Sequence, residues 1–158
     1  MAGKGTPAIV AAERAAIAFT VHEYEHDPKA ASYGLEAAEK LGVDPARVFK
    51  TLVVAVDGAL TVAIVPVETQ LDLKALGKRV TMADPKLAER TTGYVAGGIS
   101  PLGQRKPLPT VLDESAFDLE TIHVSAGQRG LEIELAPADL LALTGGQALR
   151  IAKTRETG

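Results

Sequence analysis

Lys50 is the first residue whose position along the chain suggests chemistry. It begins a β-forming run in which Leu52, Val54 and Val56 share its side, so its amine is aligned with an apolar face. A charged amine is costly there unless it reaches water or meets an anion. Two interpretations follow: a strand-end lysine that extends to solvent, or a cation at the mouth of a pocket.

A glycine-rich stretch is the second candidate, Gly97-Gly98-Ile99-Ser100-Pro101-Leu102-Gly103. Adjacent glycines let a backbone approach a ligand closely and expose N–H groups, which can stabilise an oxyanion during acyl transfer. The spacing from Gly98 to Gly103 is that of a phosphate loop, but Gln104-Arg105 stands where Lys-Ser/Thr is required. This departure argues against nucleotide hydrolysis. A turn-rich connection without chemistry is the other interpretation.

The third candidate is a turn between two predicted strands, Ser125-Ala126-Gly127-Gln128-Arg129-Gly130. Gly127 and Gly130 could simply satisfy turn geometry. Arg129 could meet a phosphate or could be a solvated surface charge. Tyr24 and Tyr33 flank a loop at 25–28, where they could be ordinary sheet-edge residues or could line a small pocket with their hydroxyls.

The histidines do not indicate a metal site. His22 and His26 are four residues apart, but their segment is predicted to be a strand, so they do not lie on one face of a helix. No cluster of further metal ligands accompanies them in the sequence. A Ser-His-Asp triad could be assembled from Ser100 or Ser125, but the Gly-x-Ser-x-Gly elbow is missing. We therefore expect no metal and no cofactor.

The composition excludes several functional classes. The chain has 158 residues, of which 46% are hydrophobic and 23% are charged, and its net charge is −3. This composition excludes a disordered chain and a strongly basic protein that binds nucleic acid through its net charge. The absence of Cys excludes disulfides, thiolate nucleophiles and Cys–zinc sites. With aromatics at 4%, a row of rings for stacking on single-stranded nucleic acid is not expected.

Helices and strands alternate along the chain and predict how these candidates are held. Helices are expected over 7–18, 33–42, 72–76, 85–93 and 137–143, and a short helical turn is expected to start at 44–45. Thr6 and Ser32 are the expected N-caps of the first two helices, and Gly42 is the glycine expected to end the second. Strands are expected over 19–25, 50–56, 59–65, 110–112, 121–125, 131–135 and 149–152. Asp57-Gly58 between two β-rich runs predicts a hairpin, and Glu132 and Glu134 alternate with Leu131, Ile133 and Leu135 as in a half-buried strand.

The result is one mixed α/β domain with a largely antiparallel sheet and flanking helices. We expect it to span 6–153, between loose tails at 1–5 and 154–158. No segment is long and apolar enough to span a bilayer and no signal peptide is evident, so a cytoplasmic protein is expected. The oligomeric state is not specified by these patterns.

Taken together, these segments resemble the YbaK family of freestanding aminoacyl-tRNA editing proteins, related to the insertion domain of bacterial prolyl-tRNA synthetases. The matches run in order along nearly the whole chain: Tyr24-Glu25-His26-Asp27-Pro28, Val48-Phe49-Lys50-Thr51-Leu52, Gln70-Leu71-Asp72-Leu73-Lys74, Met82-Ala83-Asp84-Pro85, Thr92-Gly93-Tyr94, Gly97 to Gln104, Leu108-Pro109-Thr110 and Gly130 to Leu135. They resemble the branch that removes cysteine from proline tRNA more than the branch that removes alanine.

The resemblance implies a partly barrel-like sheet and hydrolysis of the ester that joins an amino acid to the terminal adenosine of tRNA. It implies catalytic roles for Lys50, Gly97 and Gly98. It also implies a substrate pocket formed by Tyr24, Tyr33, Thr51, Ile99, Ser100, Pro101, Ser125, Gly127 and Glu132. Tyr33 and Glu132 stand where a close cysteine-specific relative has Phe and Asp, and the second change keeps the charge but moves it by one methylene.

In the cysteine-specific branch the substrate's own thiolate attacks its carbonyl and releases a thiolactone, so the resemblance implies catalysis without a protein nucleophile. The implied partners are aminoacyl-tRNA, specifically tRNA(Pro), and prolyl-tRNA synthetase. Phosphate contacts require local cations, and the candidates are Lys74, Lys78, Arg79, Arg105, Lys106 and Arg129. The alternatives are a non-catalytic module that binds aminoacyl-tRNA or the synthetase, a deacylase with another preference such as Ala, and a general esterase.

Overall fold

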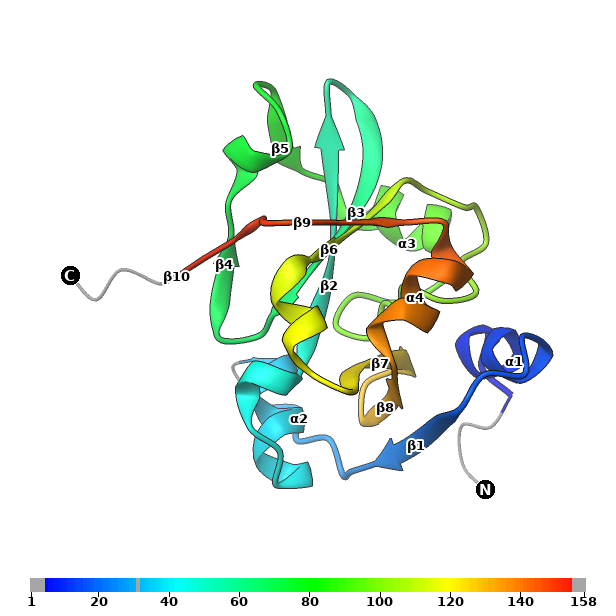
Figure 1. The fold of residues 1–158 in the computed structure, drawn as a ribbon. Helices are drawn as coiled ribbons and strands as arrows, with labels where there is room; N and C mark the ends of the chain where they lie inside the picture. The colour runs from blue at the N-terminus through cyan, green and yellow to red at the C-terminus, as the bar shows by residue number, and fades with distance from the viewer. Residues whose placement is uncertain (1–4, 31, 155–158) are drawn as a thin grey trace.

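A computed structural model describes residues 5–30 and 32–154 of the protein. The strands in this part of the chain pair into three sheets (Figure 1). The helices are α1 (Pro7–Arg14), α2 (Tyr33–Leu41), α3 (Pro85–Thr92) and α4 (Pro137–Thr144). The strands are β1 (Phe19–Glu23), β2 (Phe49–Val56), β3 (Ala59–Pro66), β4 (Thr69–Leu71), β5 (Val80–Met82), β6 (Thr110–Asp113), β7 (Ile122–Gln128), β8 (Leu131–Leu135), β9 (Gln147–Leu149) and β10 (Ala152–Thr154). Single 3-10 turns lie at Pro45–Arg47, Leu73–Ala75 and Glu114–Asp118.

The sheets have the orders β1-β8-β7, β10-β4 and β5-β2-β3-β6-β9. Strands β3, β6 and β9 run parallel to one another and the remaining pairs of the three sheets are antiparallel. The mixed α/β class and the mainly antiparallel pairing are therefore confirmed. The expected partly barrel-like sheet is instead divided, and the pairings of the described strands close no barrel.

The β2–β3 hairpin forms where the sequence predicts it. Asp57 and Gly58 both have positive φ, 51° and 85°, as a two-residue hairpin turn requires. The pairing runs from Val56 opposite Ala59 to Phe49 opposite Pro66. Because β2 also pairs with β5 on its other edge, it lies inside the sheet, and its Phe49 end is fixed where the pocket forms.

Capping side chains start α1 and α2 at the predicted positions. The Thr6 side chain accepts from the Ile9 N–H at 3.2 Å, and the Ser32 side chain accepts from the Leu35 N–H at 3.3 Å. Helix α1 is shorter than expected, because Ala16 adopts a φ of 55° and turns the chain toward β1. No helix in residues 5–30 and 32–154 is long and apolar enough to cross a membrane.

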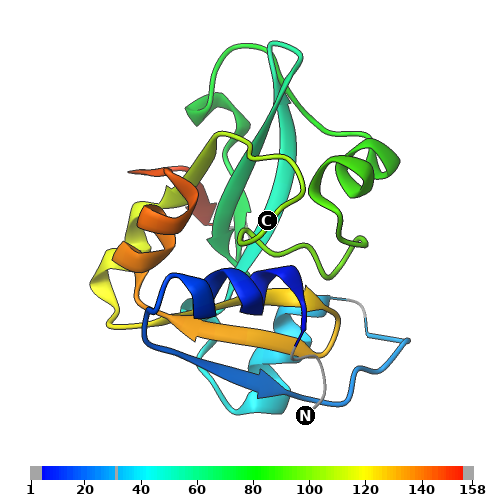
Figure 2. The same ribbon diagram turned by 90° about the vertical axis from the view of Figure 1, so that its right-hand side faces the viewer.

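Strand β8 carries both the core and the site. Leu131, Ile133 and Leu135 are buried in the core cluster that also includes residues of α1. Figure 2 shows α1 on one side of the β1-β8-β7 sheet and α2 on the other. The expected half-buried strand is wrong at Glu132, which is only 7% exposed, because this second face is covered as well.

The end of the chain differs from the prediction. The single strand expected over 149–152 is two short strands, since the Asp113 carboxylate accepts from the Ile151 and Ala152 N–H groups at 2.9 and 2.8 Å and redirects the backbone. Thr154, expected in the tail, pairs with Thr69 in the β10–β4 sheet. The other residues of the two expected tails, apart from Gly5, lie outside the described part.

Candidate active site

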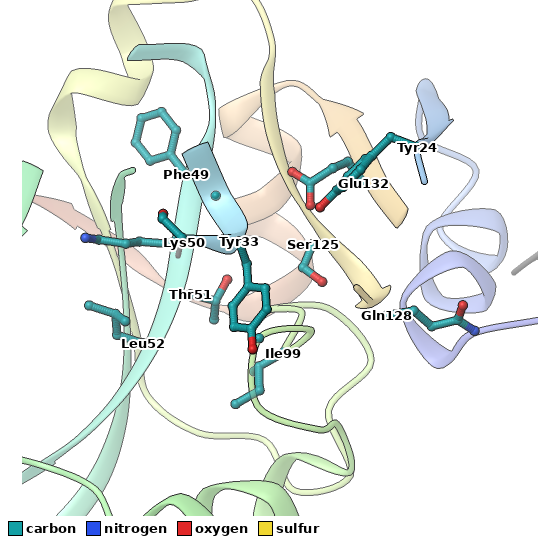
Figure 3. A pocket seen from close by; sticks show the side chains of 13 residues that line it. Tyr24, Tyr33, Phe49, Lys50, Thr51, Leu52, Ile99, Ser125, Gln128 and Glu132 are labelled. Atoms are coloured by element: carbon teal, nitrogen blue, oxygen red, sulfur yellow. The ribbon is translucent and has the colours of Figure 1, made fainter. Parts of the chain in front are cut away.

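A cavity of about 380 Å³ lies where β2, the start of α2, the β7–β8 strands and the glycine-rich loop meet. Eight of the twelve predicted site residues line it: Tyr24, Tyr33, Lys50, Thr51, Gly97, Ile99, Ser125 and Glu132. The fold thus brings together residues from five separate stretches of sequence. Figure 3 shows their side chains around this pocket.

Two hydroxyl groups face the pocket from neighbouring strands. The Thr51 hydroxyl is buried and has no hydrogen-bond partner within the described part of the chain. The Ser125 hydroxyl oxygen accepts from the Gly127 N–H at 3.1 Å, which leaves its own proton for a ligand. No histidine is hydrogen-bonded to Ser125 among the described residues, so the pocket lacks the activated serine of a Ser-His-Asp esterase. These hydroxyls are suited to binding rather than to nucleophilic attack.

Lys50 lines the pocket through its strand position, but its amine points elsewhere. Nζ donates to the Thr69 carbonyl oxygen at 2.8 Å, and Lys50 makes a further interaction. Figure 3 shows the amine turned away from Thr51 and Ser125. The structure therefore places Lys50 beside the cavity with its charge held at the start of β4.

Glu132 is the most strongly perturbed carboxyl group of the pocket. It is 7% exposed, and burial raises its pKa to about 8. At neutral pH this carboxyl group is therefore mainly protonated, because burial disfavours its charged form. Burial, followed by the nearby Glu132, also raises the pKa of the Tyr24 hydroxyl to about 12.

The glycine-rich loop borders the pocket at Gly97 and Ile99. Gly98 N–H donates to the Val95 carbonyl oxygen at 3.0 Å, which closes a four-residue turn with Gly97 at a φ of +83°. The Ala96 N–H donates to the Glu89 carboxylate at 2.8 Å. Among the hydrogen bonds of residues 5–30 and 32–154, none occupies the Gly97 N–H. The amide of Gly97, not that of Gly98, is thus available to an oxyanion.

Four predicted site residues lie outside this pocket: Gly98, Ser100, Pro101 and Gly127. Ser100 is fully buried and its hydroxyl accepts from the Leu102 N–H at 3.2 Å. Pro101 borders a different hollow near Gly103. A side chain at Gly127 would meet the Tyr94 ring at 2.7 Å. After Ile99 the loop turns into the core, so the residues that follow serve packing.

Five residues that the sequence patterns did not predict also line the pocket: Ser32, Gly34, Phe49, Leu52 and Gln128. Ser32 is the N-cap of α2, and the first turn of this helix borders the cavity. Gly34 is required there, because a Cβ would lie 2.2 Å from Val67 Cγ1. A glycine inside a predicted helix was the signal that could have revealed this close approach.

A second polar cluster lies on the same face of the β1-β8-β7 sheet. His22, His123 and Glu134 have potential ligand atoms within 4.8 Å of one another, a grouping that could hold a metal ion and that spacing along the chain did not reveal. The His22 ring and the Glu134 carboxylate are 2.9 Å apart. Glu134 also accepts from Thr121 and pairs with Arg47 at 3.7 Å. Hydrogen bonds from Thr121 and His22 lower the pKa of Glu134.

Comparisons with known proteins agree on the kind of domain. A sequence profile of the aminoacyl-tRNA editing domain matches residues 27–143. The chain is 48% identical over 120 residues to the proposed Cys-tRNA(Pro)/Cys-tRNA(Cys) deacylase EbsC of Enterococcus faecalis, which covers 72% of this chain and 73% of that protein.

Two further matches place the same domain in different settings. A proline–tRNA ligase of Shouchella clausii is 32% identical over 124 residues, 75% of this chain but 22% of the ligase. The crystal structure of a proposed trans-editing enzyme for prolyl-tRNA synthetase superimposes with a TM-score of 0.82 at 26% identity, over 93% of this chain and 95% of that one. The chain is therefore similar to nearly the whole of one solved structure and to 22% of a proline–tRNA ligase.

Proposed function

This chain belongs to the aminoacyl-tRNA editing domain family, and on that premise we propose that it is a trans-acting deacylase of mischarged Cys-tRNA(Pro). The amino-acid preference follows the 48% identical relative, whose name specifies cysteinyl-tRNA. One structural observation carries the chemistry. Within residues 5–30 and 32–154, the pocket combines a Gly97 amide and a Thr51 hydroxyl that make no hydrogen bond, and no activated nucleophile accompanies them.

An aminoacyl ester is already activated, so polarising and positioning it are sufficient for catalysis. The substrate's thiolate attacks its own carbonyl carbon, and the Gly97 N–H donates to the oxyanion that develops. The C–O ester bond then breaks, the terminal ribose recovers its hydroxyl with one proton, and a cyclic thiolactone leaves and hydrolyses. Every atom that reacts belongs to the substrate or to water.

The side chains around the reacting centre bind and orient the substrate. The hydroxyls of Thr51 and Ser125 are placed to bond the aminoacyl group. Glu132 faces the α-ammonium, whose charge would draw the buried carboxyl into its ionised form. The Lys50 amine supplies positive charge at the junction of amino acid and adenosine. To do so it leaves its hydrogen bond with the Thr69 carbonyl oxygen and binds the substrate instead.

The remaining roles concern partners and location. All six candidate phosphate-binding cations are exposed: Lys74, Lys78, Arg79, Arg105, Lys106 and Arg129. With a net charge of −3, weak intrinsic tRNA binding is expected, and we propose that prolyl-tRNA synthetase supplies selectivity for tRNA(Pro). We place this activity in the cytoplasm, where charged tRNA is used.

A deacylation panel tests the proposal. The purified protein is incubated with Cys-, Ala- and Pro-charged tRNA(Pro), with and without prolyl-tRNA synthetase. We expect the Cys ester to be lost fastest. Preferential loss of the Ala ester would reassign the specificity, and binding without loss of any ester would make the protein a recognition module.

A further inference from the structure

Arg129 reaches from the β7–β8 turn to the turn that contains Gly97. Its Nε and Nη2 both donate to the Ala96 carbonyl oxygen, at 3.0 and 2.6 Å. The guanidinium carbon also lies 4.8 Å from the centre of the Tyr33 ring, within the range of a cation–π contact. Arg129 therefore joins the start of α2, the glycine-rich loop and the β7–β8 turn beside the pocket.

The carbonyl that Arg129 holds belongs to the same peptide unit as the Gly97 N–H. In a trans peptide these two groups point in opposite directions, so fixing the carbonyl also fixes the direction of the amide. This unit is the central peptide of the Val95–Gly98 turn, and it can flip between the type I and type II forms. Gly97 tolerates φ of either sign, and its observed φ of +83° is that of type II.

We propose that Arg129 is a positioning residue that selects this turn conformation and so keeps the Gly97 N–H available to the oxyanion. The role rests on the function proposed above. Glu89 holds the same turn from its other side by accepting the Ala96 N–H. The guanidinium charge on the carbonyl also polarises the peptide, which strengthens its N–H as a donor.

The two interpretations left open for Arg129 by the sequence make different predictions. A phosphate contact would govern how tightly tRNA binds, and a solvated surface charge would govern neither binding nor rate. A residue that orients an oxyanion donor acts mainly on the rate constant of the bound complex. The maximum rate and the half-saturating concentration therefore separate the three roles.

The test uses single-turnover deacylation of Cys-tRNA(Pro) over a series of enzyme concentrations. We expect Arg129→Met to lower the maximum rate constant on the order of ten- to a hundredfold, with a half-saturating concentration within about twofold of the wild type. Arg129→Lys keeps the charge but not the paired donors, so its rate should fall between the two. Arg150→Met removes an exposed arginine from a different hollow and serves as the charge-matched control.

Proton NMR of the substrate-free protein gives an independent measurement. The Ala96 Hα lies close to the Gly97 amide proton in a type II turn and farther from it in a type I turn. The nuclear Overhauser effect between these two protons should therefore be weaker in Arg129→Met than in the wild type or in Arg150→Met. An unchanged nuclear Overhauser effect, or a deacylation loss confined to the half-saturating concentration, would overturn the proposal. A wild-type protein without deacylase activity would refute the proposed function, whereas the NMR measurement would still decide whether Arg129 holds the turn.

Discussion

Replacing Glu132 by glutamine removes one ionisation from the pocket while keeping the size of the side chain. Burial raises the pKa of this carboxyl from its ordinary value of 4.5 to about 8. Between these pH values the unfolded chain has released the proton and the folded protein retains it. Because the unfolded state then binds fewer protons, the free energy of unfolding of the wild type falls as the pH rises.

The expected size of this effect follows from the shift. It amounts to about 1.4 kcal/mol per pH unit, and to about 5 kcal/mol over the whole interval from pH 4.5 to 8. His123 acts in the opposite direction: burial lowers its pKa, so its contribution to stability is lost as the pH falls below 6.5. The His123 contribution is the same in both proteins, so it cancels when the free energy of unfolding of the wild type is subtracted from that of Glu132→Gln. The pH dependence that remains is that of Glu132.

Urea unfolding followed by circular dichroism, at intervals from pH 5 to 8, measures this difference. The stability of Glu132→Gln relative to the wild type should rise with pH by about 1.4 kcal/mol per unit. Glu13→Gln changes an exposed carboxylate and should follow the wild type. Parallel curves for Glu132→Gln and the wild type across this range would refute the assignment of a neutral buried carboxyl.

Three further predictions concern the reaction. Gly97→Ala should slow single-turnover deacylation on the order of a hundredfold, because its Cβ would lie 2.6 Å from the Tyr33 ring. The control Gly42→Ala has the same sign of φ but open space around it, so it should lower only the melting temperature. Equal rates for Gly97→Ala and the wild type would show that the loop is not part of the site. Lys50→Ala should severely reduce the rate at a nearly unchanged melting temperature, since truncation removes a charge without opening a large cavity; unchanged turnover would favour a lysine that only extends outward. Deacylation should persist in a chelator, because the assigned roles need only amides, hydroxyls and an amine, whereas a loss that zinc restores would point to the histidine–glutamate cluster.

Local signals predicted most of the elements correctly. The Asp57-Gly58 hairpin, the Ser32 cap and the left-handed Gly42 that ends α2 depend on interactions within a few residues, which the sequence displays directly. The strands β4 and β5 were missed because each has three residues and is defined by a distant partner. The early end of α1 likewise depends on where β1 must pair, not on helix propensity.

The sequence was sufficient to predict most of the residues that line the site, but not the directions in which their polar groups point. Residue types and order indicated which segments meet, and eight of the twelve predicted residues line one cavity. The direction of the Lys50 amine and the engagement of the Gly98 N–H depend on contacts with Thr69 and Val95. The burial of Glu132 required knowing that α2 covers the second face of its sheet.

Because the β7–β8 pairing is irregular, the number of residues between Ser125 and Glu132 decides which side chains reach the active site. Ser125 pairs with Glu132 while Gln128 pairs with Leu131, so two residues of β7 have no counterpart on β8. Side chains alternate between the faces of a strand, and a one-residue deletion here would exchange those faces. It would turn either Ser125 or Glu132 out of the pocket and would move Arg129 away from Ala96. Homologous sequences should accordingly tolerate substitution between Ser125 and Glu132 more readily than insertion or deletion, and a changed spacing there would mark a member whose editing site has been remodelled.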